Sequence, residues 1–315
     1  MNKYTFVYLS ILLLIFSSCS KNKIELPFRV LQEEKSYDLY SVYFNNANNG
    51  VAVGGKTWFE GTFLYTDNGG ENWTEEVLGD KQLNGLDFQS QGYGVCVGID
   101  GYLYEKDNPT AEWKYHRLQH WHFLRDIAVR SKNEMLAVGG QAYKNGAIYH
   151  MDQPWRVDEI YRIDQELSAV TFVGEDRAVA VGYGVVLLSK DKGYNWEILP
   201  IQGDFFQDVQ FINDQVGYIL GFAGTVLKTN DAGSNWQKIR NARPAGNNVL
   251  RAMAFKDEDL GFLVGDNGGF YKTEDGGDNW SKVENMPAYN FNDIFLMENK
   301  GYIVGESGII IQFDI

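Results

Sequence analysis

The sequence predicts an all-β fold, a seven-bladed β-propeller built from four-stranded antiparallel blades. One observation is a recurring turn, Thr-x-Asp-Gly-Gly-x-Asn-Trp, whose best copy runs from Thr273 to Trp280. Related copies span Ser189 to Trp196, Thr229 to Trp236, and Thr66 to Trp73. The second observation is an apolar strand that ends in glycine seven times, with successive spacings of 44, 41, 43, 39, 44 and 40 residues. Those glycines are Gly54, Gly98, Gly139, Gly182, Gly221, Gly265 and Gly305. A fixed period of this size indicates repeated units that bury a core only against their neighbours.

Each unit reads as four strands in the same order. An alternating segment such as Leu250–Phe255 comes first, and the apolar strand with the closing glycine follows it. A third strand such as Gly224–Thr229 precedes the repeated turn, and the turn leads through its Trp into a fourth strand such as Trp236–Ile239. Period-two alternation and β-branched or aromatic enrichment favour strands over helices. Four antiparallel strands per repeat are typical of a propeller blade.

The seventh unit lacks its outer strand. Its three strands are Phe291–Leu296, Gly301–Gly305 and Gly308–Phe313, after which the chain ends. The segment Phe28–Gln32 precedes the first unit and otherwise has no partner. We therefore expect it to complete the last blade and close the ring, because closure removes two open sheet edges. This places the propeller domain at residues 28–315.

The N-terminus reads as an export signal followed by a lipid-attachment site. Lys3 precedes an apolar run from Tyr4 to Phe16, 13 residues long, which is shorter than the ~20 residues of a membrane span. Small residues then lead to Cys19, as in a bacterial lipoprotein; the alternative is an ordinary secretory signal. We predict a signal peptide at residues 1–18, diacylation of Cys19, and a lipidated tether at residues 19–27. The expected location is extracytoplasmic, on the bacterial outer membrane.

The charge and cysteine content of the chain exclude some classes of partner. The net charge is −14 and no Lys/Arg cluster is present, so we expect no binding to nucleic acid. With Cys19 acylated, Cys96 is left without an intrachain disulfide partner, and it lies in an apolar strand as a buried hydrophobe. No phosphate-cradling loop or nucleophile elbow is apparent, and we predict no cofactor.

The repeated turn is interpreted as structural. Its Asp can accept backbone hydrogen bonds, its glycines permit positive φ, and its Trp can pack between blades. These copies resemble the Asp-box, or bacterial neuraminidase repeat. Together with the seven glycine-ended strands, they resemble the photosystem II stability and assembly factor family of seven-bladed propellers over residues 36–315. In photosynthetic organisms that resemblance implies a non-enzymatic binder of a membrane-protein assembly intermediate. The lipoprotein signal and the acidic charge of this chain differ from that family. We therefore expect this protein to share the fold of the family but not its photosynthetic client.

Propellers usually bind ligands on the face formed by loops between second and third strands and between blades. Aromatic residues mixed with Arg and His in those loops are typical of interaction patches, although such rings can also plug the pore or cap blade junctions. The candidate ligand face comprises Trp58, Phe59, His120, Trp121, His122, Arg125, Tyr143, Phe206, Arg243 and Arg251. His116, His120 and His122 fall within seven residues, yet no paired carboxylates accompany them, and we predict no metal site.

The leading hypothesis is a membrane-tethered, non-enzymatic scaffold that binds a protein or an envelope polymer through this face. The alternative is a carbohydrate-active enzyme, a sialidase-like glycosidase or lyase. Asp126, Asp208 and Asp293 recur at one place in three inner strands and would supply its carboxylates. Arg125 and Arg251 could line the pore, but the third Arg of a sialidase site is missing.

Overall fold

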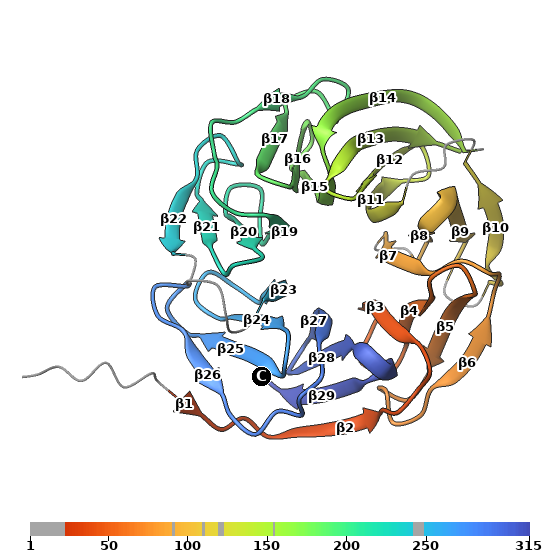
Figure 1. Ribbon diagram of the computed structural model, residues 1–315, viewed down its shortest axis with the longest axis vertical. Helices are drawn as coiled ribbons and strands as arrows, with labels where there is room; N and C mark the ends of the chain where they lie inside the picture. The colour runs from red at the N-terminus through yellow and green to blue at the C-terminus, as the bar shows by residue number, and fades with distance from the viewer. Residues whose placement is uncertain (1–22, 90–91, 109–110, 119–122, 154, 242–248) are drawn as a thin grey trace, which may run out of the picture.

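The computed structural model describes residues 23–89, 92–108, 111–118, 123–153, 155–241 and 249–315. Seven sheets stand radially around a common centre (Figure 1), which confirms the predicted propeller. Two short 3₁₀ turns, η1 (Ile99–Gly101) and η2 (Glu306–Gly308), join the second and third strands of blades two and seven. No helix within the described ranges is long and apolar enough to cross a membrane.

The blades follow the chain in order, each from its innermost strand outward. Blade one contains β3 (Asp38–Phe44), β4 (Gly50–Lys56), β5 (Glu60–Thr66) and β6 (Thr74–Val77). Blade two contains β7 (Leu83–Phe88), β8 (Gly94–Gly98), β9 (Tyr102–Lys106) and β10 (Lys114–Arg117). Blade three contains β11 (Leu124–Ser131), β12 (Glu134–Gln141), β13 (Lys144–Asp152) and β14 (Arg156–Gln165). Blade four contains β15 (Leu167–Val173), β16 (Arg177–Gly182), β17 (Val185–Ser189) and β18 (Glu197–Ile198).

The last three blades continue this pattern and include the N-terminal strands. Blade five contains β19 (Phe206–Phe211), β20 (Gly217–Gly221), β21 (Val226–Thr229) and β22 (Gln237–Arg240). Blade six contains β23 (Leu250–Phe255), β24 (Gly261–Gly265), β25 (Gly269–Thr273), β26 (Ser281–Val283) and, outermost, β1 (Lys23–Ile24). Blade seven contains β27 (Phe291–Met297), β28 (Lys300–Gly305), β29 (Ile310–Asp314) and β2 (Phe28–Gln32).

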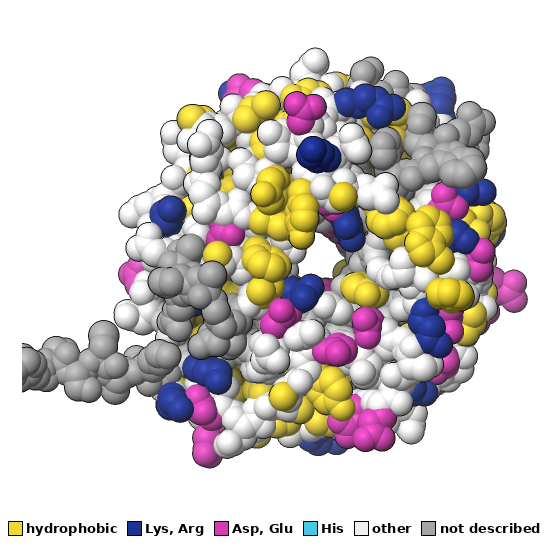
Figure 2. Space-filling view, viewed as in Figure 1, with side chains coloured by type: hydrophobic (Ala, Val, Ile, Leu, Met, Phe, Trp, Pro, Cys, Tyr) yellow, Lys and Arg dark blue, Asp and Glu magenta, His cyan; other side chains and the backbone are white. Residues whose placement is uncertain are grey.

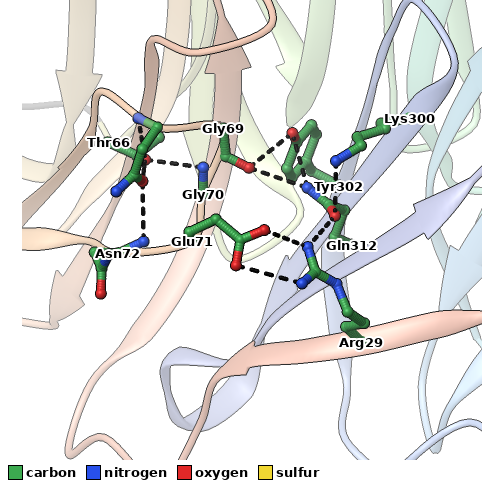
Figure 3. Close-up of polar contacts among 10 residues, drawn as sticks. Arg29, Thr66, Gly69, Gly70, Glu71, Asn72, Lys300, Tyr302 and Gln312 are labelled. Atoms are coloured by element: carbon green, nitrogen blue, oxygen red, sulfur yellow. Dashed lines mark hydrogen bonds and ion pairs between the residues drawn. The ribbon is translucent and has the colours of Figure 1, made fainter.

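Strand β2 closes the ring as predicted. It pairs antiparallel with β29, with Phe28 opposite Phe313 and Val30 opposite Ile311. Figure 3 shows further contacts of this strand: Arg29 contacts Glu71 of blade one at 2.6 Å and Gln312 of blade seven at 2.7 Å. The amide of Gln312 and the hydroxyl of Tyr302 both donate to the carbonyl of Gly69, at 3.0 Å each. The first and last blades are thus joined by side chains as well as by strand pairing.

Strand β1 is a feature that the sequence interpretation did not include. It pairs in parallel with β26, and Ile24 lies opposite Val283. Ile24, Leu26 and Phe28 alternate along the chain and pack against the core between blades six and seven. Figure 1 shows β1 and β2 following one another along the outer rim. From Lys23 onward, the segment interpreted as a tether is therefore part of the propeller surface; residues 1–22, including Cys19, lie outside the described residues.

The hydrophobic core lies between blades. Each of the core clusters of the described residues draws side chains from two neighbouring blades; the one between blades six and seven contains Phe262, Phe270, Phe291 and Phe313. Cys96 is fully buried in one of them, as expected. Because no blade encloses a core of its own, all seven depend on the ring being closed.

The closing glycines have a steric explanation. A Cβ atom at Gly265 would lie 1.9 Å from the carbonyl oxygen of Val249, which precedes the inner strand of the same blade. A Cβ atom at Gly54 would lie 2.0 Å from the carbonyl oxygen of Asp38, and one at Gly139 would lie 2.1 Å from that of Phe123. The backbone of the second strand passes so close to the chain entering the first that a side chain cannot fit.

The repeated turn acts structurally, as predicted. Asp275 Oδ1 accepts hydrogen bonds from the backbone N–H of Asn279 and the hydroxyl of Thr273, both at 2.8 Å. The indole of Trp280 donates to Gly277, whose φ is 97°. Partial desolvation raises the pKa of Asp275, but the hydrogen bonds from Asn279 and Thr273 outweigh it and hold the pKa below its usual value.

Candidate binding site at the mouth of the central channel

A cavity of about 520 Å³ opens at one end of the central channel. Each of the seven inner strands has a register shift near its start, directly after the residue opposite the closing glycine. At each shift one residue of the inner strand is left without a partner on the second strand. A β-bulge of this kind redirects a side chain, here toward the channel. The seven redirected residues all line the cavity: Tyr40, Asn84, Arg125, Ser168, Gln207, Arg251 and Asn292.

The two arginines of this ring are held by acidic side chains. Arg125 contacts the buried Glu166 at 2.7 Å, and Glu166 also accepts the backbone N–H of Tyr143 at 2.6 Å. Arg251 Nε lies 2.6 Å from Asp266. The structure thus places both predicted arginines at the mouth, each with its charge already paired.

An exposed aromatic cluster forms one wall of the mouth. It consists of Tyr143, Tyr183, Phe205 and Phe222 from blades three to five. Neighbouring ring centroids lie 5.2 Å apart for Tyr143 and Tyr183 and 6.2 Å apart for Phe205 and Phe222. Tyr143, Tyr183 and Phe222 are 58%, 48% and 39% exposed. Figure 2 shows hydrophobic side chains gathered beside the central opening, with Lys or Arg side chains at its rim.

Two members of this cluster, Tyr183 and Phe222, were missed in the sequence. Each directly follows the closing glycine of its blade, Gly182 or Gly221, and so begins the loop between the second and third strands. An aromatic residue at that place in two adjacent repeats was the available signal.

The prediction that Phe206 lies on the ligand face was wrong. Its side chain is 1% exposed and belongs to the core between blades four and five. Phe206 starts the inner strand opposite the closing glycine, a position that Leu39 and Leu250 hold in other blades. Its neighbour Phe205 lines the mouth instead. The strand alternation sends adjacent side chains to opposite faces, which separates the two rings.

Trp58 and Phe59 lie on the loop between β4 and β5 and are 49% and 78% exposed. The Trp58 ring contacts Phe123 edge-on at 5.6 Å, and the Lys81 ammonium lies 5.6 Å from its centroid. These residues are absent from the lining of the mouth cavity and form a separate exposed patch. The predicted site residues His120, Trp121, His122 and Arg243 lie outside the described residues.

The three channel aspartates have backbone partners. In each, Oδ2 accepts a hydrogen bond from a backbone N–H group. The donor is Val170 for Asp126 at 2.9 Å, Met253 for Asp208 at 2.8 Å, and Val42 for Asp293 at 2.9 Å. Each bond crosses to the next blade, so the carboxylates join neighbouring inner strands. The recurrence of Asp at this position in three inner strands therefore has a structural explanation that requires no catalytic role.

These aspartates lie at mid-channel, because they also line a cavity of about 500 Å³ at the opposite end. Burial raises the pKa of Asp126 to about 8, that of Asp293 to about 7 and that of Asp208 to about 6, against opposing hydrogen bonds from backbone N–H groups. Asp87, which accepts Val129 N–H at 2.7 Å, has its pKa raised by burial to about 7.

This arrangement predicts a dependence of stability on pH. In the unfolded chain these aspartates ionise near pH 3.9, whereas the fold keeps protons on them to higher pH. The folded state therefore binds more protons between about pH 4 and 8, and the free energy of unfolding should fall as pH rises through that window. Urea unfolding at pH 5.5 and 8.0 measures the slope. Asp126→Asn removes one titrating group and should reduce the slope; an unchanged slope would contradict this assignment.

His116, the described member of the histidine group, lies 2.9 Å from Glu105 and packs beside Trp155. Among the residues that the structure describes, no group of three or more His, Cys, Asp or Glu side chains is arranged to hold a metal ion.

Comparisons with known proteins agree with this architecture. The family described as "Photosynthesis system II assembly factor YCF48" matches residues 244–314, a stretch that contains strands β23 to β29. No curated protein matches the chain. A solved structure described as "YCF48 bound to D1 peptide" superposes with a TM-score of 0.72 at 18% identity, covering 94% of this chain and 100% of the other.

Two further structures extend the comparison. YCF48 from Cyanidioschyzon merolae gives a TM-score of 0.69 at 15% identity, over 91% of this chain and 98% of that one. The WD40 propeller domain of Doa1 gives a TM-score of 0.71 at 9% identity, over 92% of this chain and 97% of that one. At these identities the superpositions establish the fold. With the match to the family over residues 244–314, they make this chain a seven-bladed β-propeller similar to the photosystem II assembly factor YCF48.

Proposed function

We propose that this protein is a membrane-tethered, extracytoplasmic scaffold that binds a segment of a partner protein at the channel mouth. The observation that carries the proposal is the exposed aromatic cluster of Tyr143, Tyr183, Phe205 and Phe222 beside a cavity of about 520 Å³. Large aromatic side chains at the centre of an interface supply most of its binding energy. A rigid ring of blades holds them in place without a partner, which reduces the ordering cost of binding.

A protein partner is favoured over an envelope polymer by the comparison. A propeller of the same architecture has been solved as "YCF48 bound to D1 peptide", so this fold can present a peptide-binding surface. The tether is supported by the sequence, because Cys19 follows an apolar run and small residues in the manner of a lipoprotein. Two or more acyl chains would hold the propeller at the membrane surface.

Affinity purification from detergent-solubilised envelopes tests the binding face. The double variant Tyr143→Ser/Phe222→Ser should recover at least tenfold less partner than the wild type, because it removes two exposed rings of the cluster. The matched control is Ile198→Ser, since Ile198 is 59% exposed on the outer strand β18. Equal recovery by the double variant would refute the site, and release of a polysaccharide in place of a protein would refute the partner class.

The same cells test the tether. Cys19→Ser removes the acylation site, so the protein should move from the membrane pellet to the soluble extracytoplasmic fraction. Retention of this variant in the pellet would contradict lipid anchoring, without bearing on the binding face.

A further inference from the structure

The mouth cavity contains more acidic than basic groups. Among the described residues that line it, the carboxylates are Asp126, Glu166, Asp208 and Asp293, whereas the cations are Arg125 and Arg251. Both guanidiniums are already paired, Arg125 with Glu166 and Arg251 with Asp266. The three aspartates at the inner end of the cavity accept backbone N–H groups, and among the described residues no cation forms an ion pair with them. Because burial raises the pKa of Asp126 to about 8 and that of Asp293 to about 7, but that of Asp208 only to about 6, Asp208 carries most of the negative charge at the inner end of the cavity near pH 7.

The wall of the same cavity is aromatic. Tyr40, Tyr143, Phe205 and Phe222 line it, and the last three belong to the exposed cluster. The face of an aromatic ring carries negative potential and attracts ammonium and guanidinium groups within about 6 Å. Aromatic faces at the entrance and carboxylates at the inner end attract the same kind of ligand.

One further group in the cavity lacks a partner. The amide nitrogen of Gln207 is buried and has no hydrogen-bond partner among the described residues. Buried donors of this kind are rare unless a water or a ligand satisfies them. A backbone carbonyl of a docked segment would supply the acceptor.

We infer that the mouth cavity binds a cationic side chain, Arg or Lys, of the segment that docks on the aromatic cluster. The inference rests on the proposed function, which it deepens by naming the chemistry of the partner. The cation passes the rings of Tyr143 and Phe222 and reaches toward Asp208 and its two equivalents, while Gln207 donates to the main chain of the segment. The apolar stem of Arg or Lys packs on the rings as its head moves inward.

The test uses three acetylated and amidated pentapeptides, Ala-Ala-X-Ala-Ala, in which X is Arg, its neutral isostere citrulline, or Glu. Binding is followed by chemical-shift changes of the tyrosine and phenylalanine ring resonances of the propeller. The Arg peptide should bind at least tenfold more tightly than the citrulline peptide. Equal affinity for these two, tighter binding of the Glu peptide, or no shift with any peptide would overturn the inference.

Two variants locate the site. Phe222→Ala, at an exposed position, should weaken binding of the Arg peptide about threefold to tenfold, and Ile198→Ala should not change it. Asp208→Asn should reduce the preference for Arg over citrulline, and its melting curve shows whether the fold is retained. Full discrimination for Arg in both Phe222→Ala and a folded Asp208→Asn would place the cation elsewhere. Partner recovery in the affinity purification is independent of these titrations, so failure of the proposed scaffold role is distinguishable from failure of the cation preference.

Discussion

Deletion of residues 24–34 is expected to lower the melting temperature of the entire propeller by roughly 10 °C or more, in one cooperative transition. This segment supplies β2, the outer strand of blade seven, and packs Ile24, Leu26 and Phe28 against the core between blades six and seven. Half-buried apolar side chains of this size contribute about 1–2 kcal/mol each, and β29 would be left as an open edge. A change of several kcal/mol corresponds to a shift of this size in a domain of this length.

Differential scanning calorimetry measures this effect, and two variants serve as controls. A chain lacking only residues 1–22 keeps β1 and β2 and should melt like the full protein. Arg29→Ala removes the half-exposed ion pair with Glu71, and it should lower the melting temperature far less than the deletion because solvent screens such pairs. A melting curve left unchanged by the longer deletion would show that strand β2 does not hold the ring together.

Gly265→Ala is expected to destabilise the propeller by about 3 kcal/mol or more. A Cβ at this position would lie 1.9 Å from the carbonyl oxygen of Val249 and 2.8 Å from Cα of Leu250. These atoms belong to the backbone and cannot turn aside as a side chain can. Forcing them apart would shift the inner strand, which carries Arg251 at the mouth, and overpacking costs about 1–3 kcal/mol, and more where the site cannot relax.

The repeat offers a matched comparison at Gly221. A Cβ there would meet the side chain of Asp204 at 2.3 Å rather than a backbone carbonyl. Asp204 can rotate, although it would give up its hydrogen bonds to the N–H groups of Phe205 and Ala223. Gly221→Ala should therefore cost less, about 1–2 kcal/mol. Chemical denaturation of both variants gives the order, and equal losses would argue against the steric origin of the closing glycines.

Much of the fold could be derived from the chain because the information is local and repeated. The glycine-ended strands and the repeated turns set the number of blades, since each repeat forms the same four strands. The unpaired segment Phe28–Gln32 indicated how the ring closes. Strand β1 was missed because a two-residue strand has too short a pattern to stand out, although Ile24, Leu26 and Phe28 alternate as a strand should.

The candidate site could be derived only in part. Arg125, Arg251 and Tyr143 line the mouth cavity, because their position within the repeat fixes the end of the blade on which they lie. Phe206 was misplaced because alternation alone does not say which of two adjacent rings faces the core. Tyr183 and Phe222 gain their meaning only beside Tyr143 and Phe205, which come from other loops.

Periodicity along the chain was enough to specify strands, turns, blade number and ring closure, because these depend on neighbours in sequence and on a repeated steric rule. The contacts of the aspartates with the next blade and the aromatic wall of the mouth were decided by the closed ring. Each of these brings together residues from different blades, which meet only after the ring forms; Asp126 and Val170, for example, are 44 positions apart. Exposure at the mouth and the pairing of Arg125 with Glu166 depend on that assembly, whereas Arg251 pairs with Asp266 of its own blade.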